Sequence, residues 1–288
     1  FMKIEPKNIR KILDKNILAD GFEPIIDLEK SHGSFLVDQG NGDDRSMSKR
    51  RVLVTGGAGR VASILRQHWG DRYEIRLADI RPVDDLASHE TFVELDITDL
   101  DAFTGACEGI DTVVHLAADP SPNADFYESL LQRNIIGGYN GFEAARLASC
   151  RRIVFASSIN AVLGYGSSDE AAHWDVPIYP ANVYGATKCW GEALARVYDE
   201  QHSLSCICVR LTSPSFDQTS FDPQASAAAI SARDAALVFG RCVEADDDVG
   251  FAIVNGVSRH RVTWFPVSES DSRVGFEPED GTSFPIRE

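Results

Sequence analysis

The sequence predicts an α/β protein built on a doubly wound parallel sheet, with a small C-terminal segment that covers the substrate. Three observations support this fold class. Short β-branched runs alternate with helical patterns from residue 51 onward, a glycine-rich turn follows the first run, and an aspartate ends the second. Such alternation is typical of a parallel sheet that carries helices on both faces, joined by right-handed crossovers.

Bulk composition limits the classes of function. A chain of 288 residues with 43% hydrophobic and 25% charged residues can bury a full core as one large domain or two small ones. The net charge of −16 argues against nucleic acid or an anionic membrane as a partner. No apolar stretch approaches the ~20 residues of a membrane span, so the cytoplasm is the expected compartment.

The cysteines and histidines do not indicate a metal site. Six cysteines contain no C-x-x-C pair, and the seven histidines show no ligand spacing with them. Several cysteines fall within patterns that are typical of buried helices or strands. We therefore expect reduced thiols in the core and no bound metal.

Two domains are expected, with a boundary near Met47. Residues 1–46 are polar and rich in Lys and Asp, and residues 20–34 resemble the N-terminal arm of lysine 6-aminotransferases. We interpret residues 1–46 as a fused or cloning-derived extension, with Met47 as the native start and a native arm as the alternative. Residues 47–288 form the main domain, and its substrate-covering segment begins at about residue 212.

The main domain should contain a regular series of elements. Strands are expected near 51–55, 74–79, 91–95, 111–116, 151–156, 204–210 and 250–255, with helical patterns between them and a helix around 231–245. A loop rich in Ser, Pro and Asp follows residue 212. Ligands of such sheets bind beyond the carboxyl ends of the strands.

The turn after the first strand is suited to a dinucleotide. Gly56, Gly59 and Ala62 are spaced by three residues between a β-branched run and a helical pattern. The turn must be tight, must let the backbone approach a pyrophosphate and must pack the helix closely on the strand. The helix N-terminus adds amide donors for the phosphates. This is a Rossmann-type arrangement, with a glycine turn unrelated to nucleotides as the alternative.

Asp79 ends the second strand and lies 23 residues after Gly56 (79 − 56), near the spacing of a carboxylate that binds an adenosine ribose. An aspartate at this position repels a 2′-phosphate, which favours NAD over NADP. Two nearby arginines, Arg60 and Arg81, favour NADP instead. The alternative is an aspartate that only caps a turn.

Tyr184 and Lys188 are the candidate catalytic pair. On a helix, residues four apart share one face, so an ammonium group lies beside a phenol and favours its ionised form. Ser158, at the end of the expected fifth strand, supplies a hydroxyl for the reacting oxygen. Taken alone, the Tyr-x-x-x-Lys spacing is also compatible with an ordinary solvated helix face.

Together these motifs form an ordered set. The set comprises residues 56–62, Asp79, Asp96-Ile97, 115–118 (His-Leu-Ala-Ala), 134–140, Ser157-Ser158 and 184–188. Across residues 51–288 the chain resembles the short-chain dehydrogenase/reductase superfamily, in its extended epimerase/dehydratase branch. Residues 75–80, 134–137, 153–158 and 184–192 look most like uronate dehydrogenases. Residues 115–120 and 231–234 are similar to haloarchaeal NAD-dependent glucose-6-phosphate dehydrogenases.

The resemblance implies roles for individual residues. Tyr184 would act as base, with Lys188 lowering its pKa and holding the nicotinamide ribose and Ser158 binding the reacting oxygen. Ser121, Asn160 and Ser213 would face a small-molecule sugar together with Ser158 and Tyr184. The NAD site would comprise Gly56, Gly59, Arg60, Val61, Asp79, Ile80, Asp96, Ile97, Leu116, Ala117, Ala118, Asn134, Tyr184, Lys188 and Leu211. Helix-paired dimers are common among similar proteins, so a homo-oligomer is expected.

The implied activity is oxidation of a sugar or sugar-acid hydroxyl at the anomeric carbon, which yields a lactone and NADH. The chain departs from the uronate pattern at Ile159-Asn160-Ala161, and residues 216–231 lack the arginine expected to hold a sugar carboxylate. Either Arg233 or Arg259 replaces that arginine, or the substrate is neutral. A nucleotide-sugar epimerase or dehydratase, and an NAD-binding regulator without turnover, are the alternatives.

Overall fold

The computed structural model describes residues 49–167, 176–215, 229–259 and 272–281. Contacts divide the chain into two units, residues 1–46 and 47–288, and all described residues belong to the second. The prediction about the origin of residues 1–46 therefore lies outside the described ranges.

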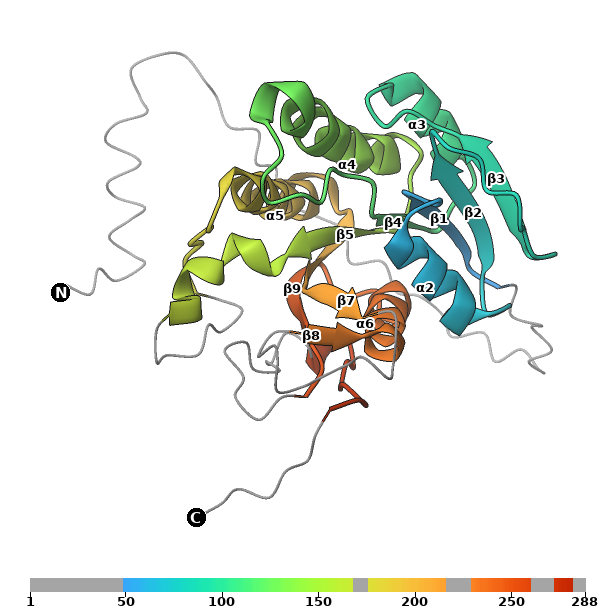
Figure 1. Cartoon of the computed structure of the whole chain (residues 1–288). Helices are drawn as coiled ribbons and strands as arrows, with labels where there is room; N and C mark the ends of the chain where they lie inside the picture. The colour runs from blue at the N-terminus through green and yellow to red at the C-terminus, as the bar shows by residue number, and fades with distance from the viewer. Residues whose placement is uncertain (1–48, 168–175, 216–228, 260–271, 282–288) are drawn as a thin grey trace, which may run out of the picture. The chain divides into compact units, whose positions relative to one another are not determined.

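The second unit is built on a seven-stranded parallel sheet in the order β3-β2-β1-β4-β5-β6-β9 (Figure 1). Its strand order reverses between β1 and β4, where dinucleotides bind in doubly wound sheets. The strands are β1 Arg51–Thr55, β2 Glu74–Asp79, β3 Glu90–Glu94, β4 Thr112–His115, β5 Arg152–Ser158, β6 Ser205–Leu211 and β9 Phe251–Gly256.

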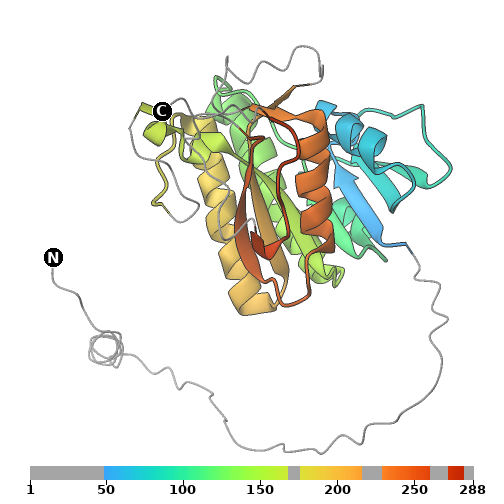
Figure 2. The same cartoon turned by 90° about the horizontal axis from the view of Figure 1, so that it is seen from below.

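Helices cover both faces of this sheet (Figures 1 and 2). Helices α2 (Arg60–Trp69) and α6 (Ala232–Glu244) pack on one face. Helices α3 (Leu100–Cys107), α4 (Gly137–Leu147) and α5 (Val183–His202) pack on the other. The predicted fold class is confirmed, and the ends of the strands agree with the predicted ranges within two residues.

The side chains of the strands explain why both faces need helices. In β1, Val52 and Val54 belong to the core cluster of α2 and α6, whereas Leu53 belongs to the cluster of α3, α4 and α5. All three side chains are at most 1% exposed. Successive strand residues point to opposite faces of the sheet. A continuous apolar run is therefore buried on both sides only when helices cover both faces, as they do here.

Several short elements were not predicted. An 11-residue π-helix, η1 (Phe126–Ile136), runs directly into α4, and the short 3₁₀ helices η2 (Ile159–Ala161) and η3 (Leu163–Ser167) follow β5. Strands β7 (Ser213–Ser215) and β8 (Ala229–Ser231) form a separate parallel pair where the sequence indicated only a loop. Strands of three residues are too short to leave a readable periodicity.

The C-terminal segment contributes more to the core than expected. Residues from about 212 are predicted to cover the substrate, and this part of the chain also contains β9, the last strand of the sheet, and α6, which packs on one face of it. Trp69 of α2 donates a hydrogen bond from its indole nitrogen to the Ala236 carbonyl oxygen of α6 at 2.9 Å. Helix α6 is thus part of the main core, and the covering role of the segment stays a prediction.

A buried arginine ties α6 to the sheet. The side chain of Arg152, at the start of β5, is fully buried and donates to the carbonyl oxygens of Cys242, Ala245 and Asp246 at 2.6 to 2.9 Å. Its Nε donates to the Ser205 hydroxyl at 2.7 Å. Burial lowers the pKa of Arg152 to about 10. The guanidinium therefore satisfies the carbonyl groups that the end of α6 leaves unpaired.

Three other sequence-based expectations concern the described residues. All six cysteines are buried and free of disulfides, as expected for core thiols. Within the described residues, no group of His, Cys, Asp and Glu is arranged to hold a metal ion. None of the described helices has the length and apolar character that a membrane crossing requires.

Replacing Gly191 with alanine should destabilise the fold. A Cβ atom at Gly191 of α5 would lie 2.5 Å from the Phe155 ring of β5. That ring cannot move aside freely, because it packs against Phe142 and His115 with centroid distances of 5.4 and 5.9 Å. We expect overpacking to lower the free energy of unfolding by about 1–3 kcal/mol, measured by urea denaturation.

Gly105→Ala is the matched control. No atom lies within 4 Å of a Cβ built at Gly105 in α3. Alanine has the higher helix propensity, so this change should raise the free energy of unfolding by about 0.5–1 kcal/mol. A Gly191→Ala protein as stable as wild type would contradict the close packing of α5 on β5.

Candidate active site

The turn between β1 and α2 brings the backbone close to the neighbouring strand. Gly56 has φ 70°, and a Cβ there would lie 3.1 Å from the Ala117 amide nitrogen. A Cβ at Gly57 would lie 2.9 Å from Cβ of Leu77. Both glycines are therefore required by space, and Gly56 also by its left-handed conformation. Gly57 was absent from the predicted site, although the Gly-Gly doublet indicated it.

The N-terminus of α2 is suited to an anion. Its N-cap is Gly59, which has no side chain to bond the first-turn amides, and Arg60 and Val61 open the helix with no acidic residue in the first turn. In contrast, α3, α5 and α6 are each capped by a side chain, from Asp99, Asn182 and Ser231 respectively. The uncapped amides and the helix dipole match the requirements of a phosphate group.

Asp79 lies beside this turn at the end of β2. Its carboxylate accepts hydrogen bonds from the Ala58 amide at 3.1 Å and from the Arg81 amide at 3.0 Å. The Arg81 guanidinium lies 3.6 Å from the same carboxylate and is 66% exposed, whereas the Asp79 side chain is 9% exposed. Ile80 is 61% exposed between them. The structure thus places the predicted ribose ligand against the glycine turn, as expected for an adenosine site.

The loops after β3 and β4 form the wall of the predicted cofactor site next to the glycine turn. Asp96 accepts hydrogen bonds from the amide and the hydroxyl of Thr98, which lower its pKa. Ile97 follows, and its carbonyl oxygen accepts from Asn140 of α4 at 2.9 Å. The Leu116 and Ala117 amides both donate to the Thr55 hydroxyl at 3.1 Å, and Ala118 continues this segment.

Thr55 and His115 act as one buried unit beneath that wall. The Thr55 hydroxyl accepts two amide hydrogen bonds, so its own proton is available to His115 Nδ1, 2.8 Å away. Burial lowers the pKa of His115 to about 3, with the Lys188 charge adding to the effect. His115 is therefore neutral and accepts from Thr55. Sequence reasoning missed Thr55, although it directly precedes Gly56.

Asn134 connects three parts of the site. Its side-chain oxygen accepts from the Asp119 amide at 2.8 Å, and its Nδ2 donates to the Asp119 carbonyl at 3.1 Å and to the Thr187 hydroxyl at 3.2 Å. Asn134 is 4% exposed. The π-helix is thus fixed to the loop after β4 and to α5, which positions these elements rather than offering a free amide to a ligand.

Ser158 and Tyr184 meet where β5 ends and α5 begins. The hydrogen bond from Ser158 lowers the pKa of Tyr184, but burial, the larger effect, raises it, and the Asp119 charge adds to the rise. Asn160 donates to the Ser158 hydroxyl at 3.1 Å, and its side-chain oxygen accepts from Asn182, the N-cap of α5, at 2.8 Å. Asn160, predicted to face the substrate, therefore orders Ser158.

Lys188 does not have the effect on Tyr184 that the sequence suggested. Its Nζ donates to the Ala156 carbonyl oxygen at 2.9 Å and lies 5.6 Å from the centroid of the Tyr184 ring. The pKa of Tyr184 is raised rather than lowered, because desolvation of the phenolate outweighs the hydrogen bond from Ser158. Burial also lowers the pKa of Lys188 to about 8.

Ser121, Leu211 and Ser213 are the other predicted site residues. The Ser121 amide donates to Asp119 Oδ1 at 3.0 Å, so Ser121 lies in the same loop as Asp119. Leu211 ends β6 beside Ser158 of β5 in the sheet register. Ser213 begins β7, and its side chain lies outside the described part of the structure. Asp119, which influences Tyr184, was not among the predicted site residues.

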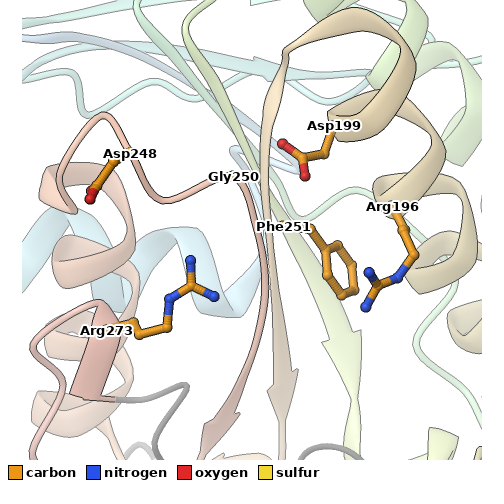
Figure 3. A pocket seen from close by; sticks show the side chains of 6 residues that line it. All are labelled: Arg196, Asp199, Asp248, Gly250, Phe251 and Arg273. Carbon is orange, nitrogen blue, oxygen red and sulfur yellow. The ribbon is translucent and has the colours of Figure 1, made fainter. Parts of the chain in front are cut away.

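A cavity of about 540 Å³ is lined by none of these residues. Figure 3 shows its lining, which comes from the second half of α5, the start of β9 and nearby segments: Arg196, Asp199, Asp248, Gly250, Phe251 and Arg273. The amino end of β9 is the opposite end from the one that carries Ser158 and Tyr184. This cavity is therefore not the predicted site.

Taken together, the residues fit NAD. The glycine turn leaves space that a Cβ would fill, the amides of α2 have no side-chain cap, and the Asp79 carboxylate, predicted to bind a ribose, lies beside the turn. The Thr55-bound loop and Asn134 complete the wall toward Tyr184 and Lys188. Along the strand ends from β2 through β1 to β5, the chemistry of these groups matches an adenosine ribose, a pyrophosphate and a nicotinamide in that order.

Comparison with known proteins agrees with this site. The sequence profile of the NAD dependent epimerase/dehydratase family matches residues 52–233. The chain is 33% identical to the NAD-dependent glucose-6-phosphate dehydrogenase of Haloferax volcanii over 81% of this chain and 94% of that protein. It is 31% identical to a uronate dehydrogenase of Pseudomonas putida, over 81% and 85% of the two chains.

A solved structure extends the likeness to three dimensions. A uronate dehydrogenase variant from Agrobacterium tumefaciens complexed with NAD superposes with a TM-score of 0.72 at 32% identity, covering 81% of this chain and 86% of the other. Profile, relatives and structure all point to one group of proteins, and the chain belongs to the NAD-dependent epimerase/dehydratase family.

Proposed function

We propose that the protein is an NAD-dependent dehydrogenase that oxidises a sugar or sugar-acid hydroxyl at the anomeric carbon. The observation that carries this proposal is the meeting of Ser158 and Tyr184 beside Lys188, at the strand ends that also present the NAD site. The relatives support the sugar class, since their names specify uronate and glucose 6-phosphate as substrates.

Each residue has a defined part in the proposed reaction. Bound NAD supplies the hydride acceptor. Ser158 holds the hydroxyl oxygen of the sugar, and Asn160 keeps the Ser158 side chain in place. Tyr184 removes the hydroxyl proton when it is ionised. Lys188, whose ammonium lies 5.6 Å from the centroid of the tyrosine ring, binds the nicotinamide ribose.

Dehydration of a nucleotide sugar is less well supported. A dehydratase needs additional acid and base groups close to the catalytic hydroxyl, and the residues after Ser158 are Ile159 and Asn160. The Asn160 amide is already engaged by Ser158 and Asn182. We therefore favour a simple oxidation, which requires one proton acceptor and one hydride acceptor.

Whether the site can bind a negatively charged sugar depends on which arginines are available to pair with its carboxylate. Of the two arginines considered for a sugar carboxylate, Arg233 is paired with Asp280 and Glu279. Arg259 is exposed, and its amide donates to the Asp280 carbonyl. Arg133 lies 3.7 Å from Asp119 and is 58% exposed, which makes it a further cation at this end of the sheet.

Two other expectations from the sequence, a homo-oligomer and a cytoplasmic compartment, stay predictions.

A panel of substrates tests the function. NADH formation should be followed with NAD or NADP against hexuronic acids, free aldoses, sugar phosphates and nucleotide sugars. We expect turnover of at least one sugar from the first three groups, with NAD preferred because Asp79 repels a 2′-phosphate. Activity confined to nucleotide sugars would overturn the proposal.

Replacing Tyr184 with phenylalanine should abolish turnover without loss of the fold. The ring packing is kept and only the hydroxyl is removed, so kcat should fall by about 10²–10⁴-fold. Binding of NADH, followed by fluorescence, should persist. Tyr73→Phe is the control, because it removes the hydroxyl that contacts Glu244, away from the strand ends. Normal turnover by Tyr184→Phe would instead support a regulator.

Lys188→Met should be inactive yet more stable than wild type at pH 7. Burial lowers the pKa of Lys188 from its ordinary 10.5 to about 8, so folding at pH 7 buries a charge that prefers water. Removing this penalty, less one hydrogen bond to Ala156, should raise the free energy of unfolding by about 1–3 kcal/mol.

The pH dependence identifies the cause. The penalty is fully present below pH 8 and disappears as pH rises toward 10.5, where the lysine is neutral in both states. Urea denaturation at pH 7 and pH 10 should therefore show the stability gain of Lys188→Met shrinking at the higher pH. A variant less stable than wild type by the same amount at both values would be inconsistent with a buried charge.

A further inference from the structure

A buried ion pair lies directly beneath the catalytic residues. Both Arg210 of β6 and Glu192 of α5 are nearly fully buried, with side chains 2% and 3% exposed. Arg210 donates from Nε to Oε1 and from Nη2 to Oε2 of Glu192, each at 2.9 Å. The Ser157 hydroxyl donates to the same carboxylate at 2.6 Å. Glu192 thus joins α5 to β5 and to β6 at one point.

This point is one residue below the reacting groups. Ser157 and Arg210 are register partners in the sheet, and the next pair toward the carboxyl end is Ser158 and Leu211. On α5, Tyr184, Lys188 and Glu192 follow one another at intervals of four residues and share one helix face. The helix therefore contacts β5 through three side chains, one per turn, and Glu192 makes the most hydrogen bonds of the three.

The stability of the core does not by itself explain why an ion pair is buried at this point. Taking both charges out of water costs several kcal/mol per ion, and apolar residues of similar volume often replace such pairs without loss of stability. Removing one partner is costly, however, because it leaves the other charge unpaired. A fully buried bidentate pair is hence better explained by the fixed geometry that it imposes than by stability.

We propose that Glu192 is a positioning residue that fixes Tyr184 and Lys188 of α5 relative to Ser158 of β5. The inference rests on the catalytic roles proposed above. Glu192, whose side chain is 3% exposed, does not touch the substrate. It acts by holding the helix and two strands in one register, so that the Ser158 hydroxyl stays within reach of the Tyr184 phenol.

The hydrogen bond between Ser158 and Tyr184 provides a sensitive readout. Two groups shift the pKa of the phenol, Ser158 from β5 and Asp119 from the loop after β4, and the Lys188 ammonium of α5 lies 5.6 Å from the centroid of the Tyr184 ring. Ser158 lowers the pKa of Tyr184 and Asp119 raises it. If the helix shifts relative to β5, the Ser158 bond weakens and the pKa rises further. A rate that requires the phenolate then reaches its plateau at higher pH.

Two variants test the proposal with the sugar that wild type oxidises fastest. Glu192→Gln removes the charge in an almost unchanged shape, and Glu192→Met combined with Arg210→Met removes the whole pair. For both folded proteins we expect kcat at neutral pH to fall by about tenfold and its pH profile to move to higher pH. The double variant should also unfold at a temperature equal to or above that of wild type.

Glu90→Gln is the matched control. Glu90 is 2% exposed in its side chain and pairs with Arg66 at 2.8 Å, where β3 begins. This change should lower stability without moving the pH profile, which is the behaviour of a merely structural ion pair.

Several outcomes would overturn the proposal. An unchanged pH profile in either folded Glu192 variant would do so. A double variant that fails to fold would also count against it, since the pair would then serve stability. Tyr184→Phe separates the two proposals: if it stays active, the catalytic assignment fails. If it is inactive while the Glu192 variants keep the wild-type profile, only the positioning role fails.

Discussion

The packing of α5 against β5 is the constraint on which the site depends. The helix carries Tyr184 and Lys188, the strand ends in Ser158, and the distance between them is set by residues that take no part in the chemistry. Gly191 allows the helix backbone to approach the Phe155 ring, where a Cβ would lie at 2.5 Å. Asn182 caps the helix and bonds Asn160, which in turn bonds Ser158. The reacting groups are thus placed by contacts on several sides of the helix.

Burial works against the chemistry before ligands bind. It raises the pKa of Tyr184 and lowers the pKa of Lys188 to about 8, so both side chains are shifted toward their neutral forms. The same effect keeps His115 neutral, which lets its Nδ1 accept a hydrogen bond from the Thr55 hydroxyl. A dry site strengthens each electrostatic interaction inside it and makes each unpaired charge expensive. The enzyme therefore carries a destabilised lysine at its centre, as is common where function requires a buried charge.

The cofactor wall relies mainly on backbone groups. Its phosphate end is a helix N-terminus without a side-chain cap, and its middle is a loop whose amides are bonded to Thr55. Side chains such as Asp96 and Asn134 mostly fix their own surroundings, through Thr98 and Asp119. Backbone amides cost little to organise once the strands are in register, because the parallel sheet already aligns the strand ends. This explains why so few conspicuous side chains mark the site.

The sequence by itself determined the order of strands and helices, the glycine turn, Asp79 and the Tyr184–Lys188 pair, because each leaves a local pattern of period, spacing or residue type. Local patterns could not show that α6 packs on the sheet beside α2, nor that η1 is a π-helix, since both depend on packing partners far along the chain. The roles of Asp119, Thr55 and Glu192 could not be predicted either, because their partners lie in other elements. Only the tertiary structure decided the sign of the pKa change at Tyr184, since desolvation depends on everything that surrounds the phenol, whereas helix spacing reports only its neighbour.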